Sequence, residues 1–71
     1  MNDKKSENFK RLAKLRGDRI VRDLHLLGNL ANKNNYTYTD DEIHVIFSVI
    51  DQELKVTKAN FSRYKKREIN L

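Results

Sequence analysis

Basic side chains near the two ends of the chain are the residues best suited to bind a ligand. Residues 1–25 carry eight Lys or Arg against four Asp or Glu, and residues 55–71 carry six against one. Residues 26–54 hold one lysine and five acidic residues, so the three segments have net charges of +4, −4 and +5 in chain order. Ammonium and guanidinium groups bind phosphate oxygens whatever the base sequence. The residues expected to bind nucleic acid or another anionic partner are Lys10, Arg11, Lys14, Lys58, Arg63, Lys65 and Lys66.

The overall charge of +5 leaves several roles open. The basic segments suit phosphates, an acidic protein surface, or the acidic middle segment of a second copy, which favours an antiparallel homodimer. The same charges also serve simply to keep a small helical protein in solution. In a helical hairpin both basic segments come to one end of the molecule, and this convergence favours a binding role.

One trio of side chains has the spacing of a catalytic or metal-binding group. Asp40, His44 and Ser48 follow at intervals of four residues, which places a carboxylate, an imidazole and a hydroxyl on one helical face. A capping aspartate near an exposed histidine gives the same pattern. The chain has no cysteine and two histidines, and it contains neither a glycine-rich phosphate loop nor a nucleophile motif. We therefore expect a non-enzymatic protein with no metal, no cofactor and no small-molecule substrate.

The second half of the sequence predicts one long helix over about residues 40–67. Thr39 and Glu42 have the spacing of a capping box, in which each side chain bonds to the backbone N–H of the other residue. Asp40 and Asp41 stand in the first turn, where the helix dipole favours negative charge. Mostly apolar positions then recur at intervals of four and three residues on one face: Ile43, Phe47, Ile50, Leu54, Thr57, Phe61 and Tyr64.

The first half predicts a helix over about residues 6–31, followed by an asparagine-rich turn over residues 32–38. Inside a helix, Gly17 costs about 1 kcal/mol relative to alanine, so it marks a kink, a break or a close helix contact. The chain thus reads as an antiparallel helical hairpin. If the first helix continues through Gly17, one of its faces carries Phe9, Ala13, Ile20, Leu24, Leu27 and Ala31.

Each predicted helix also carries a second apolar stripe that a two-helix hairpin leaves uncovered. A second copy would bury both stripes in a four-helix bundle, and a different protein partner would serve equally well. If the first helix broke at Gly17, its first half would instead fold back over part of the surplus. The residues assigned to this oligomer or partner interface are Leu12, Leu15, Leu26, Leu30, Val45, Val49 and Val56.

A length of 71 residues permits one domain. We expect a single helical domain over residues 1–71, with short flexible ends at residues 1–5 and 68–71. The longest apolar run is far shorter than the roughly 20 residues of a membrane span, and the first residues show no secretory signal. These features predict a cytoplasmic protein that does not cross a membrane.

The segment from Asn35 to Glu42, with Ser48, Asp51 and Leu54 after it, resembles the Hha/YmoA family of small bacterial nucleoid-associated modulators. Members of that family have a similar turn that opens a helix, followed by a Ser, an Asp and a Leu. The similarity covers residues 35–54. The first helix is longer here, the run after Leu54 is basic, and the aromatic C-terminal segment of the family is missing. The resemblance implies a role beside a partner protein on DNA rather than direct reading of base sequence.

The sequence therefore predicts an all-α protein that acts as a small non-enzymatic regulator, associated with nucleic acid through a basic end formed by both helices. The alternative is a protein–protein interaction module, a small inhibitor or adaptor of the kind found in phages and mobile elements. That module would bind its partner through the spare apolar stripes. The two functions differ in whether binding to nucleic acid occurs and weakens as salt rises.

Overall fold

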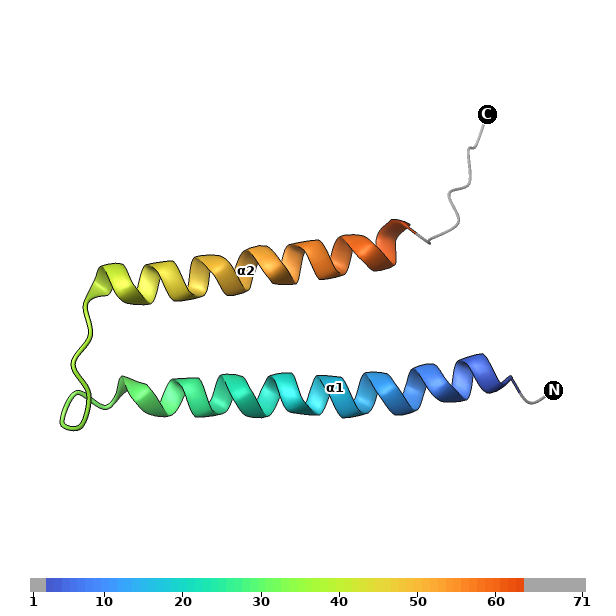
Figure 1. The fold of residues 1–71 in the computed structure, drawn as a ribbon, viewed down its shortest axis with the longest axis horizontal. Helices are drawn as coiled ribbons and strands as arrows, with labels where there is room; N and C mark the ends of the chain where they lie inside the picture. The colour runs from blue at the N-terminus through green and yellow to red at the C-terminus, as the bar shows by residue number, and fades with distance from the viewer. Residues whose placement is uncertain (1–2, 64–71) are drawn as a thin grey trace, which may run out of the picture. The chain divides into compact units, whose positions relative to one another are not determined.

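The computed structural model describes residues 3–63, which contain two helices and a short 3₁₀ segment (Figure 1). Helix α1 spans Lys4–Gly28, the 3₁₀ segment η1 spans Asn29–Ala31, and α2 spans Asp40–Arg63. No strand occurs within this range, so the all-α class is confirmed for it. The expected continuation of the second helix to residue 67 and the flexible end at residues 68–71 lie outside it.

Helix α1 belongs to the first of two units into which the chain divides, Met1–Thr37. It begins at Lys4 rather than near residue 6, because Asp3 caps it. The backbone N–H of Lys5 donates to Asp3 Oδ1 at 3.0 Å, and the N–H of Glu7 donates to the Asp3 carbonyl at 3.0 Å. Lys4 and Lys5, which the sequence assigned to a flexible end, are therefore helical.

Gly17 does not interrupt α1, which runs as one helix to Gly28. The alternative in which the helix breaks at Gly17 and folds back is therefore wrong. The single glycine penalty is offset by the strong helix formers that precede it, from Leu12 to Arg16, and by an ion pair that spans it, from Lys14 Nζ to Asp18 Oδ2 at 2.9 Å. A Cβ atom added at Gly17 would meet nothing within 4 Å.

Helix α1 ends three residues before the expected boundary at residue 31, because η1 tightens the last turn. Asn32 then builds the turn that follows. Its side-chain Oδ1 accepts from the N–H of Asn34 at 3.0 Å, and its carbonyl accepts from the N–H groups of Asn35 and Tyr36 at 3.1 and 3.0 Å. The asparagine-rich turn expected from the sequence is thus held by asparagine hydrogen bonds.

Helix α2 belongs to the second unit, Tyr38–Leu71, and starts with the predicted capping box. The N–H of Thr39 donates to Glu42 Oε1 at 2.9 Å, and the N–H of Glu42 donates to Thr39 Oγ1 at 3.1 Å. The Thr39 hydroxyl also donates to the same carboxylate oxygen at 3.1 Å. These bonds satisfy two backbone donors that a helix start leaves open, which is why α2 begins at Asp40.

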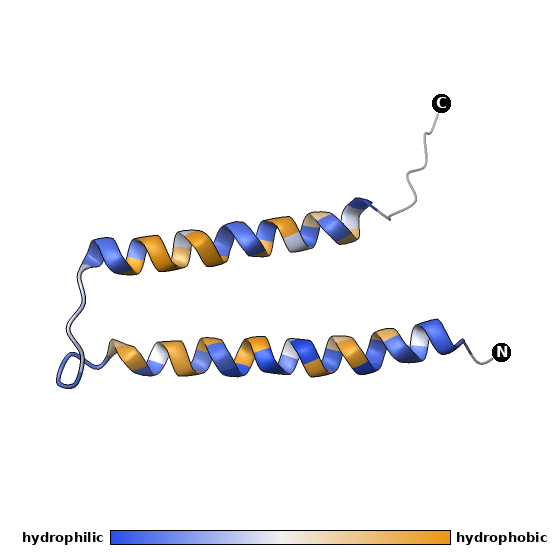
Figure 2. Cartoon of the chain, viewed as in Figure 1, coloured by the Kyte–Doolittle hydropathy of each residue, from blue (hydrophilic) through white to orange (hydrophobic). Residues whose placement is uncertain are grey.

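Apolar residues recur along both helices (Figure 2), and most of the large apolar side chains are exposed. The most sheltered large ones within residues 3–63 are only half-buried: Leu12, Leu27, Tyr38, Ile43 and Ile50. Neither helix in this range has the length and the apolar character of a membrane span. Exposed apolar surface of this extent is typical of an interaction surface.

Candidate functional site

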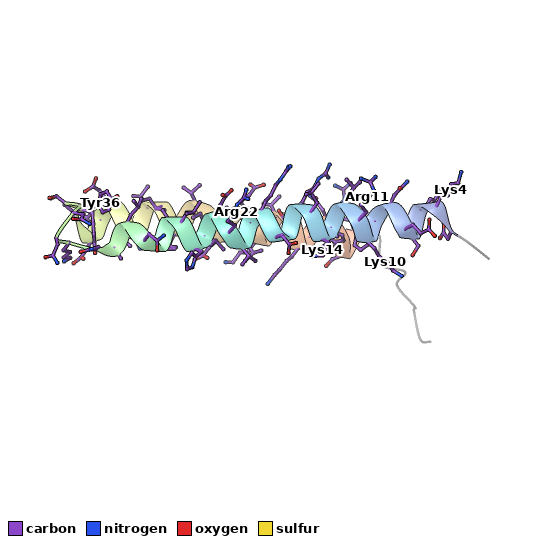
Figure 3. The ribbon with its side chains drawn as sticks, turned by 90° about the horizontal axis from the view of Figure 1, so that it is seen from below. Lys4, Lys10, Arg11, Lys14, Arg22 and Tyr36 are labelled. Carbon is purple, nitrogen blue, oxygen red and sulfur yellow. The ribbon has the colours of Figure 1, made fainter. Side chains whose placement is uncertain are left out.

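Three of the predicted anion-binding residues come together on one side of α1. Lys10, Arg11 and Lys14 all lie exposed on its N-terminal half (Figure 3). Lys14 is four residues after Lys10 and three after Arg11, and residues at these spacings are neighbours on a helix surface. This arrangement offers three positive charges to a ligand that lies along the helix.

Lys14 already has an anionic neighbour. Its Nζ lies 2.9 Å from Asp18 Oδ2, and the two side chains are 79% and 69% exposed. The pKa of Lys14 is raised from 10.5, first by the hydrogen bond from its ammonium group to Asp18 and second by the negative charge of that carboxylate. Because exposed ion pairs are weak, a phosphate can replace Asp18, and Lys14 remains a cation in either state.

Helix α2 contributes two of the predicted cations, Lys58 and Arg63, and both are exposed. They are five residues apart, so at about 100° per residue they point in directions about 140° apart. A single flat ligand therefore does not contact both equally. Lys65 and Lys66 lie outside the described residues. That the basic segments of the two helices meet at one end of the molecule stays a prediction.

The predicted interface residues present open apolar surface on both helices. On α1, Leu15 and Leu26 are exposed and Leu12 is half-buried, and Leu30 is exposed in η1. On α2, Val45, Val49 and Val56 are exposed, Val49 to 65%. Leu12, Leu15 and Leu26 lie within one continuous helix, and so do the three valines, so spacing along the sequence determines which of them share a face.

The trio around His44 forms only a loose contact. His44 Nε2 lies 3.5 Å from Ser48 Oγ, at the outer limit of a hydrogen bond. The carboxylate of Asp40 stands in the first turn of α2, where it interacts favourably with the helix dipole. Within residues 3–63, no group of three or more His, Cys, Asp or Glu side chains is arranged to hold a metal ion.

One apolar residue of α2, Ile46, belongs to neither predicted stripe. Ile46, three residues after Ile43, is one of the large exposed apolar side chains. It also lines a shallow open hollow with Asp41, Glu42 and Val45. The apolar positions that recur from Ile43 at intervals of four and three residues form the main stripe of α2, and they do not include Ile46. The signal that could have found Ile46 is its own spacing of three residues from Ile43, which places it near that stripe.

Arg22 was also left out of the predicted site, although it is exposed on α1 (Figure 3). The signal that could have found it is its separation of eleven residues from Arg11, since eleven residues make about three helical turns. That signal holds only if α1 continues through Gly17, as it does.

Comparison of the chain with protein-family models, with curated proteins and with solved structures finds no match.

Proposed function

We propose that this protein is a small non-enzymatic regulator that associates with nucleic acid through phosphate contacts. The observation that carries the proposal is the exposed group of Lys10, Arg11 and Lys14 on one side of a continuous helix. Side chains of this kind give affinity without reading bases. A cytoplasmic location, and a role beside a partner protein on DNA as the resemblance of residues 35–54 implies, belong to the same proposal.

The proposal includes an antiparallel hairpin of the two helices. Its support is a symmetry of the main stripes: Leu27 and Ile43, and likewise Phe9 and Phe61, lie at equal distances along the chain from Asn35. Asn35 belongs to the turn that Asn32 holds. One antiparallel register with its midpoint in that turn therefore aligns apolar residues along the whole length of both helices.

Dimerisation to a four-helix bundle is the second part of the proposed architecture. The spare stripes of α1 and α2 are the surfaces that a second copy would cover, and their exposed leucine and valine side chains support this role. Burial of apolar area contributes roughly 25 cal/mol per Å². A chain of this length gains from such an interface because it has few other means of stabilisation.

A salt titration with fluorescently labelled duplex DNA and duplex RNA tests the phosphate contacts. Affinity should be measurable at about 50 mM salt, and log Kobs should fall linearly as log salt concentration rises. The variants Lys10→Ala and Lys14→Ala should each weaken binding and lower the slope by about one. Lys33→Ala, which removes the same charge from the acidic middle segment, is the matched control and should change less.

Two outcomes would overturn this function. One is no binding to either duplex at about 50 mM salt, and the other is an affinity that does not depend on salt.

The second candidate, a protein-binding module, is favoured by the exposure of Leu15, Leu26 and Val49. It predicts a partner complex that is lost in Val49→Glu and retained in Lys10→Ala.

A further inference from the structure

Arginine and leucine repeat together on α1. Arg11 is followed four residues later by Leu15, and Arg22 is followed four residues later by Leu26. The two pairs are eleven residues apart, which in an unbroken helix is about three turns and a rise of about 16 Å. Because α1 continues through Gly17, both pairs lie on one face, and all four side chains are exposed.

Glutamate and valine repeat on α2 with the same period. Glu42 is followed three residues later by Val45, and Glu53 is followed three residues later by Val56. These pairs are also eleven residues apart, so they too share one face with a rise of about 16 Å between them. All four side chains are exposed on a helix that is continuous from Asp40 to Arg63.

The carboxylate of Glu42 has a defined position on this face. Its Oε1 accepts from the Thr39 N–H at 2.9 Å and from the Thr39 hydroxyl at 3.1 Å, which fixes the side chain at the start of α2. Its other oxygen is available to an external donor. No ion-pair partner is found for Glu53, Arg11 or Arg22 within residues 3–63.

We propose that α1 of one copy packs parallel to α2 of a second copy, with Arg11 opposite Glu42 and Arg22 opposite Glu53 of that second copy. The equal spacing lets both ion pairs form in one register, because each glutamate is 31 residues further along the chain than its arginine. The acidic face of α2 repels phosphate, so a basic helix of matching period is the chemistry that suits it. This interface rests on the proposed dimer and defines its register.

The same register pairs apolar residues and segment charges. Leu15 comes to the level of Val45, and Leu26 to the level of Val56, within one residue in each case. The first segment of α1, with net charge +4, lies beside the middle segment of net charge −4. In a hairpin symmetric about Asn35, residues at equal distances from Asn35 lie at the same level. The offset of 31 residues then brings residue 4 of one copy, near its open end, level with the turn of the other copy at residue 35. The two antiparallel copies therefore overlap along their full length.

A second copy fits this face better than the other helix of the same chain does. In the proposed hairpin, each helix turns its main stripe, which includes Leu27 on α1 and Ile43 on α2, toward the other helix. At about 100° per residue, Arg11 and Arg22 lie on roughly the opposite side of α1 from that stripe. Glu42 and Glu53 lie about a quarter turn around α2 from its stripe. A helix presents one face to one neighbour, so the repeats remain for an external partner.

Charge reversal of one pair tests the register by sedimentation equilibrium of the full chain at about 50 mM salt. Arg22→Glu and Glu53→Arg should each raise the dimer dissociation constant about tenfold, because two symmetric contacts become repulsive. The double variant should return it to within about threefold of the wild type. Neither residue is in the capping box or in the predicted phosphate-binding set. Asp51→Arg, the same change of charge on another side of α2, is the matched control and should leave the dissociation constant unchanged.

Circular dichroism of each variant verifies that its helices are retained. Disulfide trapping gives a second measurement, which is simple because the chain has no cysteine. Mixed Leu26→Cys and Val56→Cys chains should form a heterodimeric disulfide on oxidation, whereas Leu26→Cys mixed with Ser62→Cys should not.

A wild-type monomer at high micromolar concentration overturns the dimer. A dimer that tolerates both single reversals, or is not restored by the double reversal, overturns this register. The salt titration is a separate measurement of phosphate binding, so either result leaves the proposed nucleic-acid association standing.

Discussion

Replacement of Thr39 by alanine should destabilise α2 by a predictable amount. The change removes the Oγ1 atom that accepts from the Glu42 N–H at 3.1 Å and donates to Glu42 Oε1 at 3.1 Å. The bond from the Thr39 N–H to Glu42 remains possible, so one of the two backbone donors loses its partner. Loss of a threonine N-cap costs about 1 kcal/mol of unfolding free energy, within a range of roughly 0.5–2.

The measurement is thermal unfolding followed by circular dichroism at fixed protein concentration. For a chain of this size, about 1 kcal/mol corresponds to a fall in Tm of roughly 4–8 °C. Thr39→Ser keeps the hydroxyl and should stay close to the wild type. Thr37→Ala makes the same chemical change two residues earlier, outside the cap, and serves as the matched control. If Thr39→Ala lowers Tm no more than Thr37→Ala does, the capping box does not stabilise this helix and the reasoning fails.

Three further predictions concern α1 and the spare stripe of α2. Gly17→Ala should raise the unfolding free energy by up to about 1 kcal/mol, because an added Cβ meets nothing within 4 Å; a lower Tm in the same assay contradicts this. The raised pKa of Lys14 means that its pair with Asp18 stabilises the folded chain fully below pH 10.5 and loses this effect as the pH rises through the folded-state pKa. Melting curves at about pH 9 and about pH 11.5 should therefore differ more for the wild type than for Asp18→Asn. Val49→Glu should shift the proposed dimer toward monomer in sedimentation, and an unchanged mass would show that Val49 does not lie in its interface.

Local chemistry explains which parts of the fold were predictable. The start of α2 depends on Thr39 and Glu42, which bond to each other across three residues, so their spacing in the sequence was sufficient. The start of α1 was placed too late because the cap on Asp3 is visible only in its bonds to the backbone N–H groups of Lys5 and Glu7. Continuity through Gly17 depends on the sum of propensities over the whole helix, which a single glycine does not reveal.

The candidate site was predictable to the extent that it depends on one helix. Lys10 and Lys14 share a side of α1 because of their spacing, and this part follows directly from the period of a helix. Lys58 and Arg63 were grouped by nearness in sequence, although five residues turn them apart. Whether cations from both helices converge depends on packing between residues far apart in the chain, and helix periodicity carries no information about such contacts.

Arg11 belongs both to the proposed phosphate site and to the proposed interface with a second copy, so the two kinds of binding are linked. A guanidinium group that bonds to Glu42 of the second copy is less available to a phosphate, and linkage requires that each ligand weaken the other by the same factor. Lys10 and Lys14 are not paired in the proposed register, so the proposal leaves them available to phosphate whether or not the dimer forms. Duplex DNA should therefore raise the dimer dissociation constant of the wild type, measured by sedimentation. In Arg11→Gln, which removes the shared group and keeps the other two cations, that effect should be smaller even though DNA still binds. An equal effect in both proteins would mean that phosphate and the second copy do not compete for Arg11, and one of the two sites would then have to be placed elsewhere on α1.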